Sequence, residues 1–272
     1  MTDAELTAGT LPQAGGLSRR RLVLGGRLLL GALLLLGWEW GARSLGSVFF
    51  APPLEVAARI VALARSGVLF TDIVTTLRVS ALGFAIACVA GVLVPFLLRR
   101  SQRVTEAVEP YIMASMGIPK YALAPWLILW FGIGDLPKLV VVTLMVFYII
   151  YITTTAGIRG VDRRLIDMAR IAGAGEAVIA REIIWHSLLP FFFTGLKVAL
   201  PRAVSATIVG EFLVATEGVG HYIEYSRQVS DTVGVFAGIV VAVALVLAIN
   251  AAVNVAERRA LGWRPVEREM EL

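Results

Sequence analysis

Residues 79–98 read VSALGFAIACVAGVLVPFLL, twenty consecutive positions without a charged side chain. An α-helix needs about twenty predominantly apolar residues to cross the hydrocarbon core of a bilayer. A helix that is apolar on every side is either buried in a large protein or spans a membrane. The stretch therefore predicts a membrane-spanning helix and sets the expected fold class as all-α.

Apolar stretches on both sides of residues 79–98 predict a polytopic membrane helical bundle. About six spans are expected, at about 22–40, 73–98, 107–131, 137–158, 188–215 and 233–256. The third span is interrupted by Pro110, Pro119 and Pro125, and the fifth carries Arg202 and Glu211. Proline and charge inside a span must be satisfied by neighbouring helices or by a wet cavity. These two spans are therefore expected to face the interior of the bundle.

The composition agrees with a membrane protein. The chain is 58% hydrophobic and 17% charged, with a mean hydropathy of +0.80, whereas a soluble domain carries about 25% charged residues. The sequence pI of about 9.7 raises the question of a nucleic-acid partner. The basic residues lie in short clusters between apolar blocks, without the interleaved aromatics of a nucleic-acid surface. No nucleic acid is therefore expected as a partner.

The arginines orient the predicted spans. Clusters at residues 19–21, 99–103, 159–181 and 258–264 fall on one side of an alternating six-span path. Loops rich in Lys and Arg stay on the cytoplasmic side. We therefore expect a cytoplasmic N-terminal tail (1–21), a transmembrane domain (22–257) with a cytoplasmic loop (159–187), and a cytoplasmic C-terminal tail (258–272).

The arginines before the first span have a second interpretation. Arg19, Arg20 and Arg21 followed by apolar residues also resemble a twin-arginine export signal. No small-residue cleavage site follows cleanly, and Trp38 and Trp40 fit an interfacial aromatic belt. The stretch is therefore interpreted as a retained first span.

The loop at 159–187 is predicted to form two short amphipathic helices around a glycine turn. Asp162 is a suitable N-cap for a helix that begins at Arg163, and Glu176 begins the second helix. The apolar positions at helical spacing are Leu165, Met168, Ala169 and Ala172 before Gly173, and Ala180, Ile183 and Ile184 after it. Two short helices cannot bury such faces alone. The loop is therefore expected to pack on the membrane domain or on another protein.

The loop also resembles the cytoplasmic signature of binding-protein-dependent importers. That signature reads Glu-Ala-Ala, three residues, Gly, nine residues, Ile, one residue and Leu-Pro. Asp167-Met168-Ala169, Gly173 and Ile183 stand at that spacing here. Trp185-His186 occupies the Leu-Pro position, and a second Leu-Pro, common in one branch of the family, is kept as Leu189-Pro190.

Other segments resemble the nitrate/sulfonate/taurine-type branch of these permeases. The resemblance covers about residues 48–264 and includes Phe50-Ala51-Pro52-Pro53, Thr76-Leu77-Arg78-Val79, Gly132-Ile133-Gly134, Gly195-Leu196-Lys197 and Gly210-Glu211. It implies the fold of a type I ATP-binding-cassette (ABC) importer permease in the bacterial cytoplasmic membrane. The implied solute is a sulfonate, nitrate or a related small organic compound.

The resemblance also implies partners and a coupling contact. It implies a separate ABC ATPase subunit, an extracytoplasmic solute-binding protein and a homodimer of permeases embedded in lipid. ATP would be bound by the ATPase, so this chain would be neither an enzyme nor the holder of a cofactor. The coupling residues carried over are Asp167, Ala169, Gly173 and Ile183. Gly173 has a second reading as a plain turn glycine, and the two readings are compatible.

Five residues are candidates for lining a translocation path: Arg78, Trp126, Trp130, Arg202 and Glu211. Each has an alternative role. Arg78 would extend toward the membrane surface, the two tryptophans would pack or form an interfacial belt, and Arg202 would form a structural salt bridge. Arg202 and Glu211 are nine positions apart and fall on opposite faces of a helix, so each needs a different partner.

Missing motifs argue against ATP hydrolysis by this chain and against the common types of membrane hydrolase. The sequence contains no phosphate-binding loop of the Gly-x-x-x-x-Gly-Lys-Ser/Thr type, no Gly-x-Ser-x-Gly elbow and no His-Glu-x-x-His pair. An ion-gradient-driven secondary transporter or channel is the alternative function, and it would show inverted repeats and acidic residues near the midplane. A membrane-embedded enzyme would need a paired acid and base or a metal set in the spans. No metal site is expected.

Overall fold

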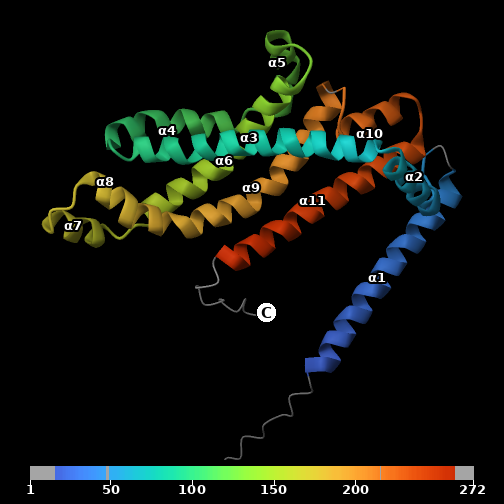
Figure 1. The fold of residues 1–272 in the computed structure, drawn as a ribbon, viewed down its shortest axis with the longest axis horizontal. Helices are drawn as coiled ribbons and strands as arrows, with labels where there is room; N and C mark the ends of the chain where they lie inside the picture. Colours follow the sequence, from blue (N-terminus) through green and yellow to red (C-terminus); the bar gives the residue numbers. More distant parts are fainter. Residues whose placement is uncertain (1–15, 47–48, 215, 261–272) are drawn as a thin grey trace, which may run out of the picture.

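The protein is described by a computed structural model that covers residues 16–46, 49–214 and 216–260, which form helices and turns and contain no strand (Figure 1). Its elements are α1 (Gly16–Leu45), α2 (Pro53–Ser66), α3 (Val68–Leu98), α4 (Gln102–Met116), η1 (Lys120–Leu123), α5 (Ala124–Phe131), α6 (Asp135–Arg159), α7 (Arg163–Ile171), α8 (Glu176–Val178), the π-helical η2 (Ile179–Ile184), α9 (Trp185–Val214), α10 (Val219–Gln228) and α11 (Thr232–Ala260). Five of the described helices are long and apolar enough to cross a membrane, or six if one bent pair counts as a span. The all-α membrane fold class is confirmed.

Helices α3, α6 and α9 form the centre of the bundle. They run side by side along most of their length (Figure 1). Their shared core consists largely of small and β-branched residues: Ala87, Val142, Val146, Ile150, Ala199, Ala203 and Ala206. Small side chains let helix backbones approach closely where no hydrophobic effect drives helices together. The core therefore depends on close van der Waals contact.

Gly91 lies at a point of close approach between α3 and α6. A Cβ added at Gly91 would lie 2.8 Å from the Cβ of Ile150 and 3.2 Å from the carbonyl oxygen of Phe147. A side chain of any size at this position would meet the branched carbon of Ile150. The absence of a side chain at Gly91 therefore sets the distance between the two helices.

The third predicted span is interrupted and consists of two helices that meet at a sharp bend. Helix α4 ends at Met116, and the chain resumes at Lys120 at an angle of 86°. Pro110 lies inside α4 and Pro125 in the first turn of α5, where a missing N–H is tolerated. The break therefore falls at residues 117–119, where Gly117 and Pro119 stand close together.

Helix α1 extends away from the rest of the described chain (Figure 1). Its leucines between residues 22 and 36 are exposed, and it contacts the bundle near its C-terminal end, where Trp38 Nε1 donates a hydrogen bond to the Ala51 carbonyl at 2.9 Å. Since α1 begins at Gly16, the predicted tail boundary at residue 21 falls inside the helix. Residues 1–15 and 261–272, which hold most of both predicted tails, lie outside the described residues.

The prediction of a separate second loop helix is wrong. The segment that begins at Glu176 continues through α8 and η2 directly into α9. No glycine stands between Glu176 and Gly195, and Pro190 in this stretch lies inside α9 without ending it. Pro190 and Pro201 lie inside α9. The second half of the loop is thus the extended beginning of the fifth span.

Candidate functional site

The loop helix α7 is closed at both ends. The Asp162 carboxylate accepts a hydrogen bond from the Arg164 N–H at 2.9 Å, which confirms the predicted N-cap. At the other end Gly173 has a φ of +82° and its N–H donates to the Arg170 carbonyl, while the Ala174 N–H donates to the Ala169 carbonyl. These two bonds form the glycine-terminated cap that satisfies the last carbonyls of a helix. Gly173 is therefore a turn glycine.

One face of α7 packs on the membrane-spanning helices. Val161, Ile179 and Ile184 are buried at this end of the bundle. The residues packed against them include Phe96, Ile158, Ile166, Ala169, Ala174 and Ile183. Two of the predicted coupling residues, Ala169 and Ile183, therefore lie in a packed cluster that joins α7 to η2 and to the ends of α3 and α6.

The other face of α7 is apolar and exposed. Leu165, Met168 and Ile171 are 48%, 67% and 88% exposed. Asp167 and Gly173 are also exposed, and a Cβ added at Gly173 would meet open space. We call the exposed side chains of Leu165, Met168 and Ile171 the α7 face. The predicted partnerless face of the loop exists, but Ile171 belongs to it and Ala169 does not.

Glu176, at the start of α8, forms ion pairs with α7 and with the end of α3. Glu176 Oε1 accepts from Arg170 at 2.7 Å, and Glu176 Oε2 lies 3.7 Å from Arg99 at the end of α3. The hydrogen bond that Arg170 donates to the Glu176 carboxylate raises the pKa of the Arg170 guanidinium above its ordinary value. The loop is therefore joined to α3 and α9 by both apolar packing and charge.

Glu211 lies in a polar network near the other end of the bundle. It is 1% exposed, and its carboxylate accepts hydrogen bonds from Thr76 Oγ1 at 2.8 and 2.9 Å and from the Gly220 N–H at 2.9 Å. Thr76 Oγ1 also accepts from the Val219 N–H at 3.1 Å. The network fastens α3 to α9 and α10. Sequence analysis paired Glu211 with no residue, although the adjacent threonines Thr75 and Thr76 in an apolar span were a usable signal.

A second charged group joins α3 to α6. Asp135 lies 2.5 Å from Arg78 Nη2 and 2.7 Å from Lys138 Nζ. Lys138 is 3% exposed and lies near enough to Glu211 for an electrostatic interaction. Arg78 is thus held in an ion pair. Lys138, which was not among the residues singled out from the sequence, is the buried member of this group.

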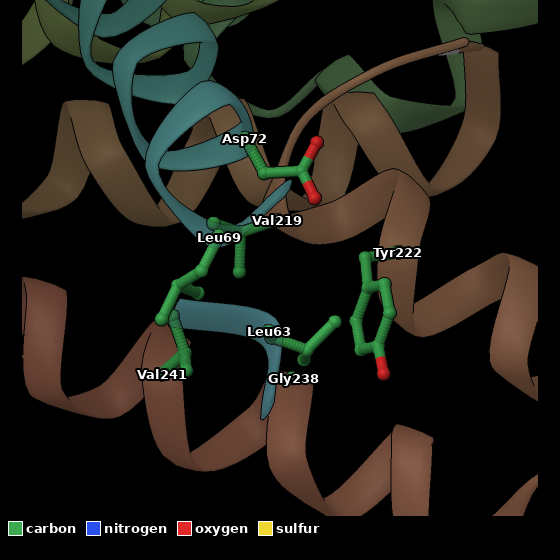
Figure 2. Close-up of a pocket in the computed structure, with 7 residues that line it drawn as sticks. All are labelled: Leu63, Leu69, Asp72, Val219, Tyr222, Gly238 and Val241. Carbon is green, nitrogen blue, oxygen red and sulfur yellow. The ribbon is translucent and has the colours of Figure 1, made fainter. Parts of the chain in front are cut away.

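A small void lies between α2, α3, α10 and α11, and Figure 2 shows the seven residues that line it. The void has a volume of about 10 Å³ and is lined mainly by apolar side chains such as Leu69 and Val241, with Asp72 at its edge. The Asp72 carboxylate accepts a hydrogen bond from the Gly218 N–H at 3.0 Å. A void of this size holds about one water molecule. This void is too small for a solute.

The remaining path candidates lie on α5 and α9. The Trp126 and Trp130 rings are 4.6 Å apart between centroids, and both side chains are exposed. Arg202 is exposed on α9 and lines a cavity of about 430 Å³ beside the bend between α4 and η1. The structure therefore separates the path candidates: Glu211 is inside the helix packing, and Arg202 borders an open cavity.

Among the described residues, no group of His, Cys, Asp and Glu could hold a metal ion.

Comparisons with known proteins agree with this architecture. A family model for the binding-protein-dependent transport system inner membrane component matches residues 83–262. The formylaminopyrimidine transport permease protein ThiX of Halalkalibacterium halodurans is 34% identical over 233 residues, 85% of this chain and 93% of that protein. The putative aliphatic sulfonates transport permease protein SsuC of Bacillus subtilis is 30% identical over 239 residues, 87% of each. A chain of the MetNI methionine ABC transporter is similar in fold, with a TM-score of 0.61 at 20% identity over 69% of this chain and 94% of that one.

Proposed function

Because this chain belongs to the family of binding-protein-dependent transport system inner membrane components, we propose that the α7 face is the surface through which a separate ATPase drives transport. The chain is a permease component of an ABC importer. This membership decides between the two transport classes that the sequence left open, in favour of the ATP-driven importer. The family implies an ATPase and a solute-binding protein as partners.

The observation that carries the coupling proposal is the α7 face itself. Three large apolar side chains are exposed on a helix of nine residues, and Ile171 at 88% has almost no contact within the chain. The rest of the helix surface is charged, with Arg163, Arg164 and Asp167 exposed. A groove in another protein would bury this apolar patch while its charged surroundings stay in water.

The packing behind α7 makes it suitable for transmitting movement. Ile179 and Ile184 are buried behind the helix, and the chain between them and α9 has no loop. A displacement of α7 would therefore act on the fifth span without slack. The ion pair between Arg170 and Glu176 adds a second connection across the turn.

The coupling proposal is tested at Gly173. Gly173→Asp places a charge in the docking contact, and Gly173→Asn is the matched control because Asn also tolerates a positive φ but carries no charge. We expect Gly173→Asp to leave the permease inserted but to weaken ATPase binding by about fivefold to 150-fold, the equivalent of about 1–3 kcal/mol, because an unpaired charge would be desolvated in the contact. Retention of the ATPase on immobilised permease and uptake of solute by cells are the measurements.

A second variant tests the α7 face without changing a residue of positive φ. Ile171→Asp changes the α7 face at a helical position and should also reduce ATPase retention, because an unpaired charge in an apolar contact is costly. If Gly173→Asp and Ile171→Asp both retain the ATPase and transport at the wild-type level, α7 is not the coupling element.

The remaining partners and the solute are part of the same proposal. ATP would be bound and hydrolysed on the ATPase, and an external binding protein would deliver the solute. Two copies of this chain would form the pore, with the coupling loop and both termini in the cytoplasm. Related permeases are named for formylaminopyrimidine and aliphatic sulfonates. The solute proposed here is accordingly a small organic compound of this kind, with sulfonates included.

A further inference from the structure

The cavity beside the bend of the third span is large enough for a small solute. Its volume of about 430 Å³ lies within the roughly 300–1,000 Å³ that is usual for small-molecule sites. Its wall combines the break between α4 and η1 with side chains of α6 and α9. Gly117 and Pro119 at the break are exposed, so the cavity is open to the surface of the chain.

The cavity lies near the middle of the membrane-spanning region. Tyr148, which lines it, is about 20 Å from the first residue of α6 and about 16 Å from the last, at about 1.5 Å per residue. Arg202 on the opposite wall is likewise about 25 Å from the start of α9 and about 18 Å from its end. A lipid headgroup would lie much nearer a membrane surface than this.

Two cationic side chains line the cavity. The Lys120 amine lies 4.6 Å from the centroid of the Tyr148 ring and donates a hydrogen bond to the Ser115 carbonyl at 3.2 Å. Arg202 is exposed and has no hydrogen bond or ion pair within the described part of the chain. No Asp or Glu stands among the described lining residues. The cavity therefore carries a net positive charge.

The uncompensated charge indicates what the cavity binds. A charged side chain at the bilayer centre is costly, and such residues mark solute pathways or are paired with a counter-charge. A guanidinium offers several donors to an oxyanion, and bonds to charged groups are about twice as strong as neutral ones. The other lining residues are apolar or polarisable, including Met116, Met145 and the Tyr148 ring. An apolar organic group would fit these walls.

We propose that this cavity is the membrane binding site for the transported solute and that the solute is a small organic anion. Its charged group is held by Lys120 and Arg202, and its apolar part contacts Tyr148, Met116 and Met145. The inference rests on the proposed function as a permease and adds to it the charge class of the solute and the residues that select it.

The test is direct binding to the full-length permease in nanodiscs of zwitterionic lipid. The probe is 1-naphthalenesulfonate, and the neutral comparison is 1-naphthalenemethanol, which has a similar ring. We expect the wild-type protein to bind the sulfonate in preference to the alcohol in equilibrium dialysis. Arg202→Gln should weaken sulfonate binding by about tenfold to hundredfold, because a charge-assisted contact is lost. Arg202→Lys should keep most of the binding.

Control variants separate the cavity from general effects of charge. Arg65→Gln removes an exposed arginine of α2, outside the cavity, and should not change sulfonate binding. Lys120→Gln should weaken binding even if Arg202→Gln does not fold. Equal binding of sulfonate and alcohol, or unchanged binding by both Arg202→Gln and Lys120→Gln, overturns the proposal. Competition by added phosphatidylglycerol would assign the cavity to lipid and also overturn it.

The same variants distinguish this inference from the coupling proposal. Arg202→Gln should retain the ATPase on immobilised permease, because Arg202 lies about 25 Å along α9 from the end of that helix that adjoins η2 and the α7 cluster. Loss of sulfonate binding with the ATPase retained supports the cavity assignment. Failure of the wild-type permease to retain an ATPase would contradict the coupling proposal and leave the binding result unaffected.

Discussion

Glu211 and Thr76 illustrate how a charge is accommodated inside a membrane-spanning bundle. The carboxylate is 1% exposed and receives hydrogen bonds from the Thr76 hydroxyl and from the Gly220 N–H. A buried charge is costly unless it is hydrogen-bonded. These contacts also tie α9 to α3 and to the start of α10, so Glu211 acts through the helices it joins.

We predict that Thr76→Val destabilises the permease by about 1–3 kcal/mol, because it leaves the Glu211 carboxylate buried with one donor fewer. Thr76→Ser keeps the hydroxyl and is the matched control. Thermal unfolding in detergent measures both variants. Equal unfolding midpoints for Thr76→Val and Thr76→Ser would show that the hydroxyl does not stabilise the carboxylate.

A double-mutant cycle measures the interaction between Thr76 and Glu211 directly, as a difference between variants. If Thr76 and Glu211 act on each other, Thr76→Val should cost much less in a Glu211→Gln background than in the wild type. Additive effects of the two substitutions would contradict a direct interaction.

Among the elements, the pair α3 and α6 shows how close contact replaces the hydrophobic effect. Gly91 faces the branched Cβ of Ile150, which cannot move aside as a long flexible side chain would. Lipid tails are as apolar as the helix surfaces, so helix association depends on van der Waals fit. A steric clash at this contact should therefore push α3 and α6 apart.

We predict that Gly91→Ala destabilises the permease by about 1–3 kcal/mol, the usual effect of overpacking. Gly31→Ala in α1 is the control, since a Cβ there would meet no atom within 4 Å. The Gly91→Ala/Ile150→Ala pair should regain part of the lost stability, because the second change removes the obstructing atoms. The measurement is the midpoint of thermal unfolding of each variant in detergent. A Gly91→Ala variant as stable as the Gly31→Ala variant would contradict the packing argument.

At the scale of the whole molecule, the two ends of the bundle differ in what they expose. One end carries α7 with its apolar face (Figure 1). At the other end, Asp72 accepts a hydrogen bond from the N–H of Gly218, and Thr76 and Glu211 accept hydrogen bonds from the first turn of α10. In an importer, the end that meets the ATPase faces the cytoplasm. The arginine clusters of the sequence lead to the same orientation.

This orientation predicts the accessibility of engineered cysteines. The native Cys88 is the only cysteine in the sequence, so Cys88→Ala provides a background without thiols. In that background Arg227→Cys should react with a membrane-impermeant maleimide in intact cells, whereas Arg163→Cys should react only after permeabilisation. Both native side chains are exposed, so a lack of reaction would not reflect burial. Labelling of the residue 163 cysteine in intact cells would overturn the topology.

The sequence by itself determined the features that depend on neighbouring residues. Long apolar stretches such as 79–98 specify spans because a bilayer requires about twenty apolar residues, whatever the rest of the chain does. Asp162 and Gly173 specify the ends of α7 because capping involves bonds over a few residues. The composition likewise excluded a soluble fold, and the spaced loop motif pointed to the family.

Only the tertiary structure decided which side chains meet. Thr76 and Glu211 are 135 residues apart, and no local pattern shows that the hydroxyl lies on the carboxylate. The face of α7 that stays exposed was settled by the burial of Ile179 and Ile184 behind it. The sequence likewise presented Arg202 and Glu211 equally as charged residues of one span and candidates for the translocation path. Packing against distant helices buried Glu211 and left Arg202 beside a cavity, because burial depends on the arrangement of several helices at once.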